Sequence, residues 1–325
     1  MPKGCIIYCI ETGLLEKNSL MSIASIRQFG GKLNDYDIFC IQPRAYFNIS
    51  KKTKSLLSEF GATFIKVPLN IRHNYYALAN KPLVCDYIMK NYAYDHYIFL
   101  DSDTLVLNVP TELLSFSGEI GLCPVAHQGI GIPANISTVD KYWKQLLDHL
   151  KIDESNLPIV ETSRSKESII AYWNSGVISF GGRSSICEEW KNLLNYVLDH
   201  RALPESGIFF VEQTCLSAVL LQSKYQVQQM SVSLNFPMTR KSIQQDEVIN
   251  LNEICVLHHY NNLRIIKDRQ YEILGEDRAE WIDQQLDRFG IYPQSLFQKW
   301  GLNITMLQIA LKQKLFYLAN RLSSN

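Results

Sequence analysis

The stretch Tyr97-Ile98-Phe99-Leu100-Asp101-Ser102-Asp103-Thr104-Leu105-Val106-Leu107 decides the fold. Its first four residues are apolar and include aromatic and β-branched side chains, which predicts a short buried strand that ends at the first acid. Alternate side chains on an extended backbone share a face, so Asp101 and Asp103 can converge on one point. Two carboxylates at the end of a buried strand are costly unless a positive charge meets them.

A hard divalent cation is the natural partner for this pair of acids. Mn²⁺ and Mg²⁺ prefer oxygen ligands, and a cation that is held by one or two carboxylates keeps positions open for substrate phosphates. The alternative is that Asp101, Ser102 and Asp103 form a solvated turn, because the Asp-x-Asp pattern is common by chance. The rest of the sequence has to decide between the two.

The composition is that of a globular protein without a strong electrostatic partner. The 325 residues are 46% hydrophobic and 20% charged, and Lys+Arg and Asp+Glu both number 32. A net charge of zero gives no basic field for nucleic acid. The eight cysteines form no zinc-type spacing, and the N-terminal apolar run is too short for a signal peptide. We therefore expect a cytoplasmic protein.

Strands and helices alternate through the first part of the chain. Strands are predicted over 5–10, 36–41 and 62–67, with helices over 19–29 and 55–60 between them. This alternation predicts an α/β fold with a doubly wound, mostly parallel sheet. Residues 105–109 and 120–123 are predicted to continue that sheet.

Ligands of such sheets bind outside the carboxyl ends of the strands. Ile10, Glu11 and Thr12 lie at one such end, and the two aspartates lie at another. Two separate stretches thus predict a site at the same edge. The polar segment 153–168 is a candidate lid over it.

Further candidate residues occur where predicted elements begin. Lys81 opens a helix predicted over 76–90 and can meet a phosphate there, or it is simply solvated. The block Asn174-Ser175-Gly176 starts an apolar strand and either lets the backbone approach a ligand or forms an ordinary turn. The pair Glu212-Gln213 heads an apolar helix, where the acid faces either a substrate or the helix dipole.

Two adjacent histidines, His258 and His259, stand at the end of another predicted strand. Neighbouring side chains on a strand point to opposite faces, so at most one of them reaches a shared site. Beyond residue 262 the sequence indicates no further chemistry.

The last part of the chain is predicted to be helical. We expect a main domain over 1–265 and a C-terminal helical extension over 266–325. One face of the extension carries apolar residues, namely Leu302, Met306, Ile309, Ala310 and Leu315, with basic residues elsewhere. The favoured interpretation is a helix that packs on the main domain, and the alternative is a basic amphipathic surface for peripheral membrane contact.

Taken in order, these features resemble metal-dependent glycosyltransferases of the GT-A fold, nearest to the glycogenin and lipopolysaccharide galactosyltransferase type. That fold is Rossmann-like, with a mostly parallel central sheet flanked by helices. The matching pieces are Cys5 to Ile10, Ile98-Phe99-Leu100-Asp101-Ser102-Asp103, Trp173-Asn174-Ser175-Gly176-Val177, Glu212-Gln213, Asn235 and His259-Tyr260.

The resemblance implies a role for each candidate residue. Asp101, Asp103 and His259 would bind the metal, Mn²⁺ or Mg²⁺, together with the donor's diphosphate, and Asp101 would also reach the donor's ribose or sugar. The other roles would be donor binding by Ile10, Glu11, Thr12, Lys81 and Ser102, contact with the donor sugar and acceptor by Asn174, Ser175 and Gly176, and flanking of the reacting carbon by Glu212 and Gln213.

The chain departs from the family pattern at two places. The family's Asp-Gln pair is Glu212-Gln213 here, and the Gly and Lys-Pro-Trp that often follow the family's histidine are missing after Tyr260. The second departure keeps His258 open as a substitute for His259.

The implied activity is transfer of a sugar from a nucleotide-diphosphate sugar, UDP-linked, to a hydroxyl of a glycan, lipid-linked or protein acceptor. The resemblance favours retention at the sugar carbon with Gln213 beside it, whereas inversion would need Glu212 as a base. Two alternatives stay open. One is a sugar-phosphate nucleotidyltransferase, although the Gly-rich, Arg-containing loop of such enzymes is missing after the first strand. The other is a noncatalytic protein that binds sugar nucleotides.

Overall fold

A seven-stranded sheet forms the centre of the computed structural model, which describes residues 3–291 except 136–138, 183 and 245, and also Leu311. The strand order is β10-β6-β9-β4-β1-β2-β3, and β9 alone runs against its neighbours. The strands are β1 Gly4–Cys9, β2 Asp37–Gln42, β3 Ala62–Lys66, β4 His96–Leu100, β6 Ile120–Pro124, β9 Trp173–Gly181 and β10 Val227–Gln229. The predicted α/β fold with a mostly parallel sheet is confirmed.

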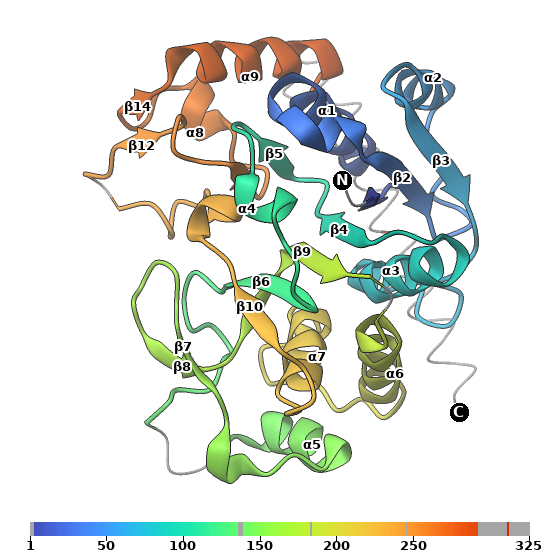
Figure 1. The fold of residues 1–325 in the computed structure, drawn as a ribbon, viewed down its shortest axis with the longest axis vertical. Coiled ribbons are helices and arrows are strands. Elements are labelled where there is room, and N and C mark those ends of the chain that lie inside the picture. Colours follow the sequence, from blue (N-terminus) through green and yellow to red (C-terminus); the bar gives the residue numbers. More distant parts are fainter. Residues whose placement is uncertain (1–2, 136–138, 183, 245, 292–310, 312–325) are drawn as a thin grey trace.

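Helices cover both faces of this sheet (Figure 1). Alternation along β1 explains why, since Ile6 and Tyr8 enter one apolar core and Cys5 and Ile7 enter the other. The helices are α1 Leu14–Phe29, α2 Lys51–Glu59, α3 Asn80–Asn91, α4 Thr111–Leu114, α5 Lys141–Leu150, α6 Ile186–Asp199, α7 Val211–Leu220, α8 Arg264–Lys267 and α9 Glu276–Phe289. Helices α1, α2 and α9 contribute to the first of these cores, and α3, α5, α6 and α7 contribute to the second.

A second sheet of three short strands begins after the carboxyl end of β4. Its order is β11-β13-β5, with β5 Thr104–Val106 antiparallel to β13 Val256–His258 and β11 Phe236–Pro237 parallel to β13. The prediction that 105–109 continues the main sheet is therefore wrong. The reason is that β9 pairs with β4 on the side that β5 would need, so the turn after Leu100 sends the chain into the small sheet.

The candidate lid is a hairpin that is bound to its surroundings. It consists of β7 Ile159–Glu161 and β8 Ser168–Ile170. The backbone N–H groups of Ser163 and Arg164 donate to the carbonyl oxygens of Val125 and Ala126. Arg164 also forms an ion pair with Glu247. These contacts attach the hairpin to the segment that directly follows β6 and to the segment before β12.

Residues 266–291 pack into the first core together with α1. The strand β14 Ile273–Leu274 pairs with β12 Ile249–Asn250, and Figure 1 shows α9 lying along α1. The apolar residues predicted at 302–315 lie outside the described residues, and the division at 265 stays a prediction. Among the described residues, no helix has the length and apolar character needed to cross a membrane.

The buried His96 on β4 makes stability depend on pH. Its Nδ1 bonds to the hydroxyl of Tyr36 at 3.0 Å, its Nε2 bonds to Ser179, and burial lowers its pKa to about 4. The unfolded chain takes up a proton near pH 6.5, whereas the folded protein resists it until about pH 4. The stabilisation is therefore complete above pH 6.5 and is lost as the pH falls toward 4.

We expect His96→Asn to be less stable than the wild-type protein at pH 7, with a gap that narrows by about 3 kcal/mol between pH 7 and pH 4. Urea unfolding of both proteins across this range measures the gap. The difference between the two free energies of unfolding at each pH removes the contribution of the carboxylates, which both proteins share. A gap that does not change with pH would show that His96 is not the titrating group.

Candidate functional site

The turn between β4 and β5 fixes the two aspartates at the carboxyl edge of the main sheet. The N–H of Asp101 donates to the carbonyl oxygen of Gly176 at 2.8 Å, which continues the β4–β9 pairing by one residue. The N–H and hydroxyl of Thr104 both donate to the carbonyl oxygen of Asp101, at 3.2 and 2.8 Å. Ser102 is buried between the two acids. The predicted strand thus ends directly before the first acid, and the turn that follows is held at both ends by backbone bonds.

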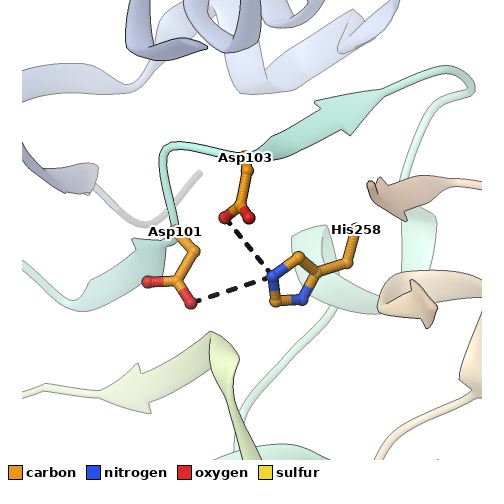
Figure 2. Close-up of side chains that lie close together, drawn as sticks. All are labelled: Asp101, Asp103 and His258. Carbon is orange, nitrogen blue, oxygen red and sulfur yellow. Dashed lines mark ion pairs between the residues drawn. The ribbon is translucent and has the colours of Figure 1, made fainter. Parts of the chain in front are cut away.

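The side chains of Asp101, Asp103 and His258 converge, as Figure 2 shows. Nε2 of His258 lies 3.4 Å from Oδ1 of Asp103 and 3.9 Å from Oδ2 of Asp101. The three ligand atoms lie within 4.8 Å of one another. Two carboxylate oxygens and one imidazole nitrogen are a donor set that fits Mn²⁺ or Mg²⁺.

The electrostatics of this cluster keep Asp103 ionised. Burial alone would raise the pKa of Asp103, but a proton on His258 and the charge of Lys81 hold that pKa well below the ordinary value of an aspartate. The side chains of Asp101 and Asp103 are 19 and 20% exposed, so the cluster is reached from solvent. Two solvent-accessible carboxylates beside an imidazole are suited to bind a cation.

The structure brings His258 into the cluster and leaves His259 outside it, which corrects the preference for His259 as the ligand. Pairing of His258 with Thr104 in the β13–β5 ladder turns its side chain toward the aspartates. His259 follows the last residue of β13 and contributes no ligand atom to this cluster. Its N–H donates to the carbonyl oxygen of Asp103, its Nδ1 accepts from the N–H of Asn261, and burial lowers its pKa to about 4.

Lys81 reaches the same site from the start of α3. Its Nζ lies 2.8 Å from Oδ2 of Asp101, 3.1 Å from Oγ of Ser175 and 3.6 Å from Oε2 of Glu212. Its side chain is 9% exposed, so the alternative of a solvated lysine is wrong. Burial would lower its pKa, but the two carboxylates raise the pKa above the ordinary value of lysine. Lys81 is therefore a buried, permanently charged cation between two acids.

The pair at the head of α7 completes this side of the site. Glu212 is 2% exposed, accepts a hydrogen bond from Ser175 at 3.1 Å, and burial raises its pKa to about 7. Its Oε1 has no hydrogen-bond partner among the described residues. Oε1 of Gln213 accepts from the N–H of Ser175 at 3.4 Å. The acid and the amide thus both contact Ser175 near the start of β9.

Glu11, which follows β1, is linked to the start of α3 through Asn80, the neighbour of Lys81. Ile10 is buried, and the N–H of Thr12 donates to the carbonyl oxygen of Phe47. Glu11 is 1% exposed and is bound by Arg44 through both carboxylate oxygens, and by Nδ2 of Asn80 at 3.1 Å.

Arg44 was missed by the reading of the sequence. The available signal was a charged residue directly after Pro43, at the carboxyl end of a predicted strand and therefore at the edge where the site lies.

Three solved glycosyltransferase structures are distantly similar to this chain. GlyE of Streptococcus pneumoniae TIGR4 is 14% identical, with a TM-score of 0.48 over 87% of this chain and 61% of the GlyE chain. The galactosyltransferase LgtC, solved with donor and acceptor sugar analogs, is 13% identical, with a TM-score of 0.46 over 91% and 99% of the two chains. Mouse xyloside xylosyltransferase 1 is 9% identical, with a TM-score of 0.47 over 79% and 97%. The chain therefore spans about three fifths of the length of GlyE.

The sequence itself matches one described family. No curated protein sequence matches this chain. The family described as Rhodobacterales glycosyltransferase domain matches residues 6–223, a part that includes Lys81, both aspartates and Glu212-Gln213 but stops before His258. Since the match covers more than half of the chain, this protein belongs to the Rhodobacterales glycosyltransferase domain family.

Proposed function

We propose that this protein transfers a sugar from a nucleoside-diphosphate sugar, UDP-linked, to an acceptor hydroxyl in a reaction that depends on Mn²⁺ or Mg²⁺. The observation that carries the proposal is the convergence of Asp101, Asp103 and His258 within 4.8 Å at the carboxyl edge of the sheet. Membership of a glycosyltransferase family supports the reaction class. The oxygen-rich donor set supports the metal.

The acids and His258 would hold the cation, which when bound offsets the negative charge that develops on the departing diphosphate. Lys81 supplies a fixed positive charge on the same side, next to Asp101. Because this lysine is buried and already paired, it needs little rearrangement as charge develops. Ile10, Glu11 and Thr12 are proposed to lie near the nucleotide base, and Ser102, Ser175 and Gly176 near the donor sugar.

We propose retention at the sugar carbon, with the side-chain amide of Gln213 beside it. The alternative, inversion, has a candidate base in Glu212, which is buried and has its pKa raised to about 7. Oε2 of Glu212 is bound to Ser175 and lies near Lys81, so a role in positioning these groups also accounts for the residue. The anomeric configuration of the product separates the two mechanisms.

The acceptor is proposed to be a glycan, a lipid-linked sugar or a protein, and the location to be the cytoplasm. Peripheral membrane contact through the C-terminal extension, 266–325, is the alternative to packing of this extension on the main domain. Two domains, 1–265 and 266–325, remain the proposed organisation.

The test is a panel of nucleotide sugars incubated with the full chain and simple sugar acceptors, with nucleoside diphosphate release as the readout. We expect release with Mn²⁺, loss of release in EDTA and recovery when Mn²⁺ is returned. NMR of the product from an α-linked donor should show an α-linkage. A β-linkage would establish inversion instead.

Other outcomes would point to the alternatives. Pyrophosphate release from a nucleoside triphosphate and a sugar phosphate would identify a nucleotidyltransferase. Stabilisation by nucleotide sugars in a thermal-shift assay, without turnover on any acceptor, would identify a binding protein.

A further inference from the structure

A chain of hydrogen bonds leads from one backbone N–H to the imidazole of His258, and every link in it has a defined direction. It starts at Gly176, whose N–H lies 2.8 Å from a side-chain amide atom of Asn174. A backbone N–H only donates, so the Asn174 atom that faces it must be the oxygen, Oδ1. This first link fixes the orientation of the Asn174 amide without any assumption about the groups that follow.

The next link passes through Asn235. A side-chain atom of Asn235 lies 2.8 Å from the same Oδ1 of Asn174, and since an oxygen only accepts, that atom must be Nδ2. The other end of the amide, Oδ1, then faces Nδ1 of His258 at 2.9 Å. An amide oxygen cannot donate, so Nδ1 of His258 must carry a proton. In the neutral imidazole, Nε2 is left with its lone pair.

Tyr260 covers one face of the His258 ring, and Gly176 lies at the Cε1 edge of that ring. The Tyr260 ring stacks on the His258 ring with centroids 3.8 Å apart and an angle of 18°, and its hydroxyl accepts from Nδ2 of Asn174 at 3.2 Å. A Cβ at position 176 would lie 2.3 Å from Cε1 of His258. His258 is 3% exposed and Asn235 is 5% exposed, so water has little access to the bonds between them.

We propose that Asn174, Asn235 and Tyr260 are positioning residues that hold His258 in the Nδ1–H tautomer, with the Nε2 lone pair aimed at Asp101 and Asp103. The metal in this inference rests on the proposed function. The arrangement gathers three electron-pair donors at one point before any donor substrate binds. Partners of this kind, outside the metal ligands themselves, fix the tautomer and direction of a ligating histidine. Asn174 thereby gains a role distinct from contact with the donor sugar.

The protons on the two ring nitrogens are measured directly by long-range ¹H–¹⁵N NMR of the metal-free full chain labelled in histidine, recorded at pH 8. The His258 signals are assigned as those missing from His258→Gln. We expect the Nδ1–H pattern in the wild-type protein. In Asn235→Ala, we expect a shift toward Nε2–H, because that proton can then be donated to Asp103. Mn²⁺ affinity, followed by electron paramagnetic resonance, should fall about 10- to 100-fold.

Two further variants separate positioning from a general loss of structure. Asn235→Asp keeps an acceptor for Nδ1–H and should restore the Nδ1–H pattern that Asn235→Ala loses. Asn192→Ala, an exposed substitution on α6, is the matched control and should change neither the tautomer nor the Mn²⁺ affinity. If Asn235→Ala does not fold, Tyr260→Phe tests the same chain by removing only the hydroxyl that holds Asn174.

The outcomes distinguish this inference from the proposed function. An Nδ1 of wild-type His258 that carries no proton at pH 8, or an Asn235→Ala protein with unchanged tautomer and Mn²⁺ affinity, would overturn the positioning role. A wild-type protein with the Nδ1–H tautomer that binds Mn²⁺ but transfers no sugar would overturn the proposed function and leave the positioning role standing.

Discussion

Replacing Asp103 by asparagine should lower metal-dependent nucleoside diphosphate release by at least about 100-fold, more than the loss of a residue that only orients a metal ligand. The substitution keeps the size of the side chain and removes the charge that lies 3.4 Å from Nε2 of His258. The backbone should not respond, because the carbonyl oxygen of Asp103 still accepts from the N–H of His259. The measurement is kcat/KM for the donor at saturating Mn²⁺, together with the Mn²⁺ dissociation constant.

The matched control for this prediction is Asp148→Asn. Asp148 lies on α5 with a side chain that is 64% exposed, and its ion pair with Lys144 is a surface contact. Its loss should leave both turnover and Mn²⁺ binding unchanged. If Asp103→Asn turned over at the wild-type rate with the wild-type metal requirement, the cluster would not be the active centre.

Local sequence patterns were sufficient for the central part of the fold. The apolar run before Asp101 is β4, and alternating strands and helices give the mostly parallel sheet. The resemblance to GT-A glycosyltransferases is confirmed by the family match. The strands and helices are predictable because the burial of one face of a strand or helix gives a characteristic spacing of apolar residues within a short stretch of sequence.

Long-range pairing explains what the sequence could not decide. The sequence limits the site to one of His258 and His259, but the choice depends on the register of β13 against β5, two strands about 150 residues apart in the chain. The burial of Glu11 against Arg44 likewise depends on β2 lying next to β1, which no local pattern encodes.

Replacing Lys81 by methionine should destabilise the protein by about 3 to 5 kcal/mol, the usual cost of removing one partner from a buried ion pair. Lys81 faces Asp101 at 2.8 Å and Glu212 at 3.6 Å, and Glu212 is almost fully buried. Methionine keeps most of the packing of the aliphatic chain, so the loss reports the charge that remains uncompensated. Urea unfolding at pH 7.5 without metal is the measurement. Transfer activity should fall as well, because the fixed cation beside Asp101 is lost.

The double variant Lys81→Met/Glu212→Gln tests the cause of this loss. If two neighbouring acids without a cation are responsible, neutralising one of them should recover part of the stability, and the effects of the two substitutions should not add. Lys144→Met, in an exposed pair, is the control and should change stability little. Additive losses would mean that Lys81 contributes by packing alone. The double variant should remain inactive even where its stability recovers. Stability requires only that the charges of residues 81 and 212 balance, whereas the proposed reaction requires the positive charge of Lys81 beside the donor's diphosphate.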